Sequence, residues 1–70
     1  MQSFYRKQVL TALSYHFMGT KYHALRQRIR RKLNRIDTLA VYYQLLGDDK
    51  YQIKIDKIKK SIKELLNEKA

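Results

Sequence analysis

A run of arginine and lysine is the part of this sequence best suited to binding chemistry. Residues 23–36, HALRQRIRRKLNRI, contain six basic residues and no acidic residue. The planar guanidinium group of arginine donates two parallel hydrogen bonds to a phosphate or carboxylate, so this composition suits an anionic ligand. The predicted phosphate contacts are Arg26, Arg28, Arg30, Arg31 and Arg35, supported by Lys21, Lys32, Arg6 and Lys7.

Like charges within this run argue against an ordinary solvated helix face. Three pairs of basic residues stand at i and i+4, among them Arg28 and Lys32. Each such pair destabilises a helix by about 0.2–0.5 kcal/mol. Solvated faces usually mix the two signs of charge, as Asp56, Lys60 and Glu64 do near the carboxyl terminus, where we expect i,i+4 ion pairs. The pattern favours an anion-binding surface, with a merely solvated face as the alternative.

The positive charge lies mainly in the first half of the chain. The net charge is +10, and residues 1–36 hold nine Lys or Arg and no acid, whereas residues 37–70 hold seven Lys and six acids. Nucleic acid is the commonest partner of such a surface, and it binds through phosphates with strong salt dependence. We therefore expect a small accessory or regulatory protein that binds DNA or RNA with little sequence specificity.

Two other functions fit the same residues. The first is a protein-interaction module, of the kind found among phage and mobile-element regulators, that binds an acidic partner on the basic run. Such a module could also bind an apolar partner at Val41 and Tyr42, which point away from the expected core. The second is a helix-turn-helix DNA-binding regulator, because residues 10–33 place a short turn at Gly19 and Thr20 between two helices.

The six tyrosines add an aromatic element, since a ring is able to stack on an unpaired base. Tyr22, Tyr43 and Tyr51 occupy apolar-stripe positions, where packing in the core is the simpler interpretation. Tyr5 and Tyr15 are the tyrosines left as candidates for contact with a single strand.

Catalytic and cofactor chemistry is not indicated. The absence of cysteine excludes disulfides and thiolate metal sites, and His16 and His23 are too sparse for a metal cage. No Gly-rich phosphate loop, signal peptide or apolar run of about 20 residues is present. We expect a soluble, cytoplasmic protein that is not an enzyme and takes no metal, cofactor, membrane or small-molecule substrate.

Two glycines divide the chain into three predicted helices, over about 3–18, 21–46 and 50–67. Gly19 precedes Thr20, a suitable N-cap, and Gly47 precedes Asp48 and Asp49, either of which could cap the last helix. The middle helix has an apolar stripe that continues past a possible break near residues 34–38. Short connections make neighbouring helices antiparallel, so the predicted fold is all-α: one domain over 1–70, a small three-helix bundle of antiparallel hairpins around a long central helix.

The size of the chain raises the question of a second copy. A 70-residue chain buries only about 60% of the surface that its unfolded form exposes, and it lacks disulfides. Small domains of this kind often gain stability by oligomerising. A homodimer is therefore a candidate arrangement for this protein.

Overall fold

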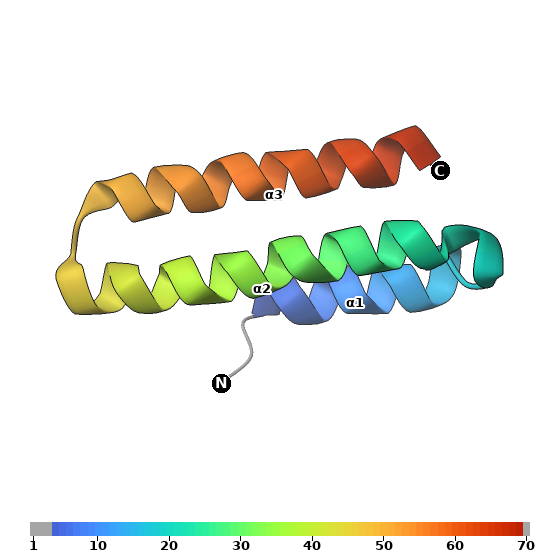
Figure 1. Cartoon of the computed structure of the whole chain (residues 1–70), viewed down its shortest axis with the longest axis horizontal. Coiled ribbons are helices and arrows are strands. Elements are labelled where there is room, and N and C mark those ends of the chain that lie inside the picture. Colours follow the sequence, from blue (N-terminus) through green and yellow to red (C-terminus); the bar gives the residue numbers. More distant parts are fainter. Residues whose placement is uncertain (1–3, 70) are drawn as a thin grey trace.

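The computed structural model describes residues 4–69, and in this range the chain forms helices and no strand (Figure 1). The prediction of an all-α fold with packed helices is confirmed for these residues. The elements are α1 (Phe4–His16), the 3₁₀ turn η1 (Thr20–Tyr22), α2 (His23–Leu46) and α3 (Asp49–Lys69).

The first connection differs from the sequence prediction, which began the second helix at residue 21. Gly19 adopts φ 97°, and the Tyr22 N–H donates to the Gly19 carbonyl at 3.3 Å. This hydrogen bond between residues i and i+3 closes a 3₁₀ turn, so the α-helix begins only at His23. Neither η1 nor α2 has a side-chain hydrogen bond at its amino-terminal cap, so Thr20 does not act as the N-cap that the sequence predicted.

The second connection is a tight turn at Gly47. Its φ of 67° is left-handed, a conformation that glycine adopts without strain, and its N–H donates to the Tyr43 carbonyl at 2.8 Å. Asp48 then caps α3, because its Oδ1 accepts a hydrogen bond from the Lys50 backbone N–H at 3.0 Å. The chain therefore reverses direction within two residues, and α3 returns along α2.

Helix α2 runs without a break through residues 34–38. The Thr38 hydroxyl donates to the Asn34 carbonyl at 3.1 Å, so Thr38 satisfies its hydrogen bonding inside one helix and does not cap a new one. The continuous helix carries a single apolar stripe along its whole length.

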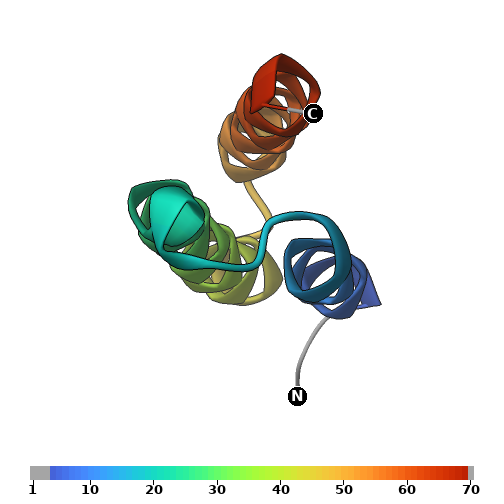
Figure 2. The same ribbon diagram turned by 90° about the vertical axis from the view of Figure 1, so that its right-hand side faces the viewer.

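The core lies between α1, α2 and α3, which form a triangle when seen end-on (Figure 2). Ile29, Leu33 and Ile62 are at most 1% exposed. Burying each of these side chains contributes about 1.5–3 kcal/mol. The buried cluster consists of Val9, Leu13, Phe17, Leu25, Ile29, Leu33, Ile36, Leu39, Ile55, Ile62 and Leu65.

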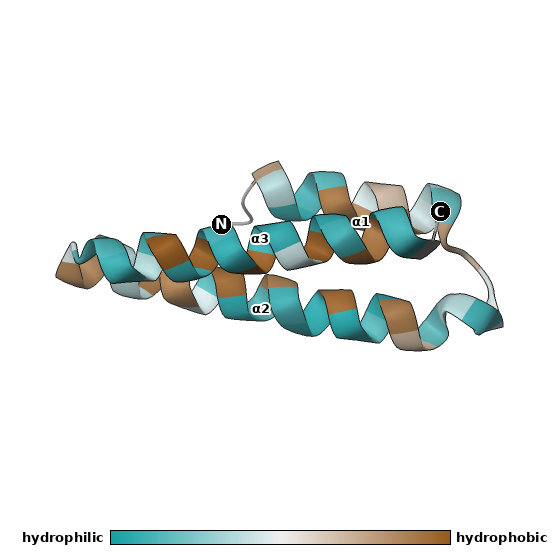
Figure 3. Ribbon diagram, turned by 90° about the horizontal axis from the view of Figure 1, so that it is seen from above, coloured by the Kyte–Doolittle hydropathy of each residue, from teal (hydrophilic) through white to brown (hydrophobic). Residues whose placement is uncertain are grey.

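Helix α1 is too short to cover the whole of the α2–α3 hairpin. It has 13 residues, whereas α2 has 24 and α3 has 21, and the turn between α2 and α3 extends beyond it (Figures 1 and 3). We call this uncovered part of the hairpin, residues 41–53, the hairpin end. Apolar side chains are exposed there, including Leu45 (75%), Leu46 (65%), Ile53 (56%) and Val41 (53%).

Truncating a core side chain is expected to lower the free energy of unfolding much more than truncating an exposed side chain. The Leu33→Ala variant should lose about 2–5 kcal/mol of unfolding free energy, because it forfeits buried surface and leaves a cavity. The Leu45→Ala variant, at an exposed site, should stay within about 0.5 kcal/mol of the parent. Urea unfolding followed by circular dichroism measures both. Equal losses for the two variants would contradict the core described here.

Candidate nucleic-acid interface

The nine basic residues that the sequence singled out do not form one surface. The structure uses some of them to hold helices together and leaves the others on the surface. The distinction rests on hydrogen-bond partners and on which neighbouring helix each side chain faces.

Arg6 connects α1 to α2. Its Nη1 lies 2.9 Å from Asp37 Oδ2 and 3.0 Å from Asn34 Oδ1, and its side chain is 19% exposed. A partly buried, charge-assisted contact of this kind fixes the position of one helix on the other. Arg6 therefore serves the fold, although the sequence had placed it among the supporting phosphate contacts.

Arg26 closes the carboxyl-terminal end of the first helical segment. Its Nη1 donates to the carbonyls of Phe17 and Gly19, at 2.8 and 2.7 Å. The last carbonyls of a helix lack intrahelical partners, and a cationic donor there also complements the negative end of the helix dipole. A predicted phosphate contact is thus engaged by the backbone of its own chain.

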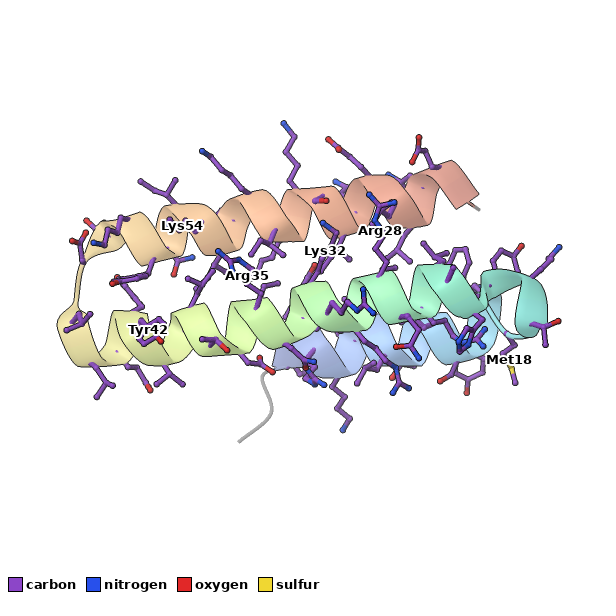
Figure 4. The ribbon with its side chains drawn as sticks, in the orientation of Figure 1. Met18, Arg28, Lys32, Arg35, Tyr42 and Lys54 are labelled. Carbon is purple, nitrogen blue, oxygen red and sulfur yellow. The ribbon has the colours of Figure 1, made fainter. Side chains whose placement is uncertain are left out.

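Other predicted basic residues meet along the seam between α2 and α3. Figure 4 shows Arg28, Lys32 and Arg35 projecting from α2 into the space beside α3, with Lys54 on the α3 side. Arg28 and Arg35 are exposed and Lys32 is half-buried. In the described part of the chain, none of these cations forms an ion pair with a carboxylate. With Lys21 they make up what we call the basic face: Lys21, Arg28, Lys32, Arg35 and Lys54.

Two clefts mark the ends of the basic face. One, of about 510 Å³, is lined by Lys21 and Arg28 together with Leu65 and Glu68. The other, of about 380 Å³, is lined by residues 34, 35, 38, 39, 42, 51 and 54. Glu68 is an acidic residue of the first cleft, whereas the residues that line the second include no carboxylate.

Lys54 is the member of the basic face that sequence reasoning missed. The third helix looked charge-balanced, with Lys60 expected to pair with Asp56 and Glu64. The structure forms neither pair: Asp56 Oδ1 accepts a hydrogen bond from Gln52 Nε2 at 3.0 Å, and Lys60 makes no ion pair within the described residues. Only the packing of α3 on α2 brings Lys54 beside Arg35.

The remaining predicted cations lie elsewhere. Arg30 lines a cleft on the side of α1, with Ser14 and Met18. Arg31 and Lys7 are exposed, Lys7 on α1, and neither lines the seam clefts. The structure therefore assembles five cations into one face and leaves these three outside it.

Val41 and Tyr42, predicted together as a partner interface, face different directions because adjacent helical residues are about 100° apart. Tyr42 lines the 380 Å³ cleft with Arg35 and Lys54, and its ring centroid lies 5.7 Å from that of Tyr51. Val41 lines none of the clefts described above and is 53% exposed. The two neighbours therefore differ in their surroundings, and a shared partner interface stays a prediction.

The two tyrosines proposed for stacking also differ from each other. Tyr5 is half-buried beneath the Lys59 ammonium, which lies 4.8 Å from the ring centroid, and burial raises the pKa of its hydroxyl. Tyr15 is 79% exposed on α1 and lines none of the described clefts. Of these two candidates, Tyr15 has an exposed ring, whereas the Tyr5 ring is half-buried and faces a cation of its own chain.

Comparison with models of protein families, with characterised proteins and with solved structures finds no significant match to this chain. No helix within residues 4–69 is long and apolar enough to cross a membrane. The same residues contain no group of three or more His, Cys, Asp or Glu side chains that would hold a metal ion. The function must therefore be argued from the geometry of the basic face.

An arginine that is hydrogen-bonded within the protein and an arginine of the basic face should contribute differently to stability. We expect Arg26→Gln to lower the free energy of unfolding by about 1–2 kcal/mol, because two charge-assisted bonds to carbonyls are lost. Arg28→Gln should leave it within about 0.5 kcal/mol, since that side chain has no intramolecular partner to lose. Urea unfolding of both variants tests this. A larger loss for Arg28→Gln would show that Arg28 also serves the fold.

Proposed function

We propose that this protein binds nucleic acid through the basic face and contacts phosphates with little preference for sequence. The observation that supports the proposal is the convergence of five cations from η1, α2 and α3 along one seam, without an ion-paired carboxylate in the described residues. The protein acts in this proposal as an accessory or regulatory factor, not as an enzyme.

The electrostatics of the basic face explain why a polyanion is the fitting ligand. Arg28, Lys32 and Arg35 stand three or four residues apart, so their charges repel within one helix. A run of phosphates relieves this repulsion and releases condensed counterions, which drives binding without base recognition. Arginine adds bidentate hydrogen bonds to phosphate oxygens.

Several finer features belong to the same proposal. In this proposal α2, with its long apolar stripe, is the central helix of the bundle, and the protein works in the cytoplasm. A homodimer, and an apolar partner at Val41 and Tyr42, stay predictions. The apolar residues of the hairpin end are exposed beside the basic face.

A second candidate function is capture of an acidic protein on the same basic face. The charge complementarity that favours phosphates also favours clustered carboxylates. The two functions differ in their ligand, because an acidic protein partner would leave nucleic acid bound weakly and without saturation.

The helix-turn-helix hypothesis receives no support from the packing of the first two helices. The two helices of that motif cross at about 90–120°. Here α1 and α2 lie side by side with nearly parallel axes, in both the side view and the end view (Figures 1 and 2). The proposal therefore does not rest on groove reading by the start of α2.

Salt dependence is the direct test of phosphate contact. If the five cations of the basic face each meet a phosphate, the slope of log K against log salt on duplex DNA should be about −4 to −5. Fluorescence anisotropy with labelled duplex at several salt concentrations measures the slope. Failure to saturate at about 100 mM salt would reject nucleic-acid binding and favour the protein partner.

Charge reversal on the basic face should weaken binding far more than the same reversal elsewhere. We expect Arg28→Glu/Arg35→Glu to lower affinity at least about 10-fold, because two phosphate contacts become repulsive. The control Lys60→Glu/Lys63→Glu changes net charge equally but lies on the cleft between α1 and α3, and should cost less than about 3-fold. Equal losses in folded variants would assign binding to net charge and not to this face.

A further inference from the structure

The 380 Å³ cleft at one end of the basic face contains an open aromatic surface. Tyr42 is 47% exposed, and its ring contacts that of Tyr51 at an interplanar angle of 40°. Tyr51 is itself half-buried against the core, so it supports the Tyr42 ring from one side. One part of the Tyr42 side chain is held by the protein and another part is available to a ligand.

Cations from both helices line the same cleft as this aromatic surface. They are Arg35 of α2 and Lys54 of α3, and Figure 4 shows both near the seam with Tyr42 further along α2. Thr38 adds a polar side chain to the lining. An aromatic ring beside two cations matches a nucleotide, in which a flat base is joined to a phosphate.

We propose that this cleft binds an unpaired base stacked on Tyr42, with the adjoining phosphates on Arg35 and Lys54. The ligand class is then single-stranded nucleic acid, an inference that rests on the proposed binding function and adds its substrate. A duplex keeps its bases stacked inside and offers no free face to Tyr42. Of the other cations of the basic face, Arg28 and Lys32 lie along the same seam, and Lys21 lies with Arg28 in the opposite cleft.

An exposed ring alone does not distinguish Tyr42 from the other tyrosines, as Tyr15 shows. It is more exposed than Tyr42, at 79% against 47%. Neither of the two seam clefts includes it. Tyr42 instead combines an accessible ring, a supporting ring and two neighbouring cations, and Tyr15 therefore provides the matched control.

The experiment measures anisotropy of three labelled probes of equal length, about 12 nucleotides, the range that single-strand sites cover. They are oligothymidine, a strand of the same length with abasic positions, and a blunt duplex, with oligouridine added to compare RNA with DNA. Tyr42→Leu should weaken oligothymidine binding at least about 5-fold, because stacking on the ring is lost. Tyr42→Phe and Tyr15→Leu should stay within about 2-fold.

Two further results are expected. The parent protein should bind oligothymidine more tightly than the duplex, although the duplex carries the denser charge. The abasic strand should bind more weakly than oligothymidine, and Tyr42→Leu should not change its affinity.

Failure of the base-stacking site and failure of the proposed nucleic-acid binding would give different results. Equal effects of Tyr42→Leu and Tyr15→Leu, or equal affinity for the abasic strand, would overturn the base site while phosphate binding stands. Insensitivity of every probe to Arg28→Glu/Arg35→Glu would overturn the proposed function itself. Circular dichroism of each variant establishes that the compared proteins are folded.

Discussion

Burial of the apolar stripe of α2 is the constraint on which the rest of the structure depends. Ile29 and Leu33 are almost completely buried, and Ile62 of α3 lies in the same cluster. Because the stripe needs cover, α1 and α3 both contribute side chains to the core beside it. The arginine-rich run flanks the stripe, so Arg28, Lys32 and Arg35 lie at the seam with α3, and the interaction that stabilises the bundle also positions these cations.

The bundle uses arginine in two chemically different ways. Arg6 of α1 donates hydrogen bonds to a carboxylate and an amide of α2. Arg26 of α2 donates to two backbone carbonyls in the segment that follows α1. Arg28 and Arg35 lie toward α3, Arg28 in the cleft that contains Glu68 and Arg35 in the cleft that contains Lys54. Neither forms an ion pair within the described residues, so Arg6 and Arg26 join helices while Arg28 and Arg35 keep their charge for an external anion.

The unequal lengths of the helices give the hairpin end its character. Helix α1 begins near the point where Arg6 meets Asp37, so among the described residues the last turns of α2 have only α3 beside them. Tyr42 is consequently supported by Tyr51 yet half-open, and Val41 is exposed on another side. A short first helix thus leaves the aromatic cleft accessible at one end of the basic face.

The sequence by itself determined the helices, because apolar spacing and the glycines at residues 19 and 47 are local signals. It also predicted the core stripe and the flank shared by Arg28 and Arg35, since helical periodicity fixes which residues share a face. Which arginines find acceptors depends on residues far apart in the chain, such as Arg6 and Asp37, and only tertiary packing brings them together. The same packing placed Lys54 and Tyr42 beside Arg35, a juxtaposition across two helices that no periodicity within one helix encodes.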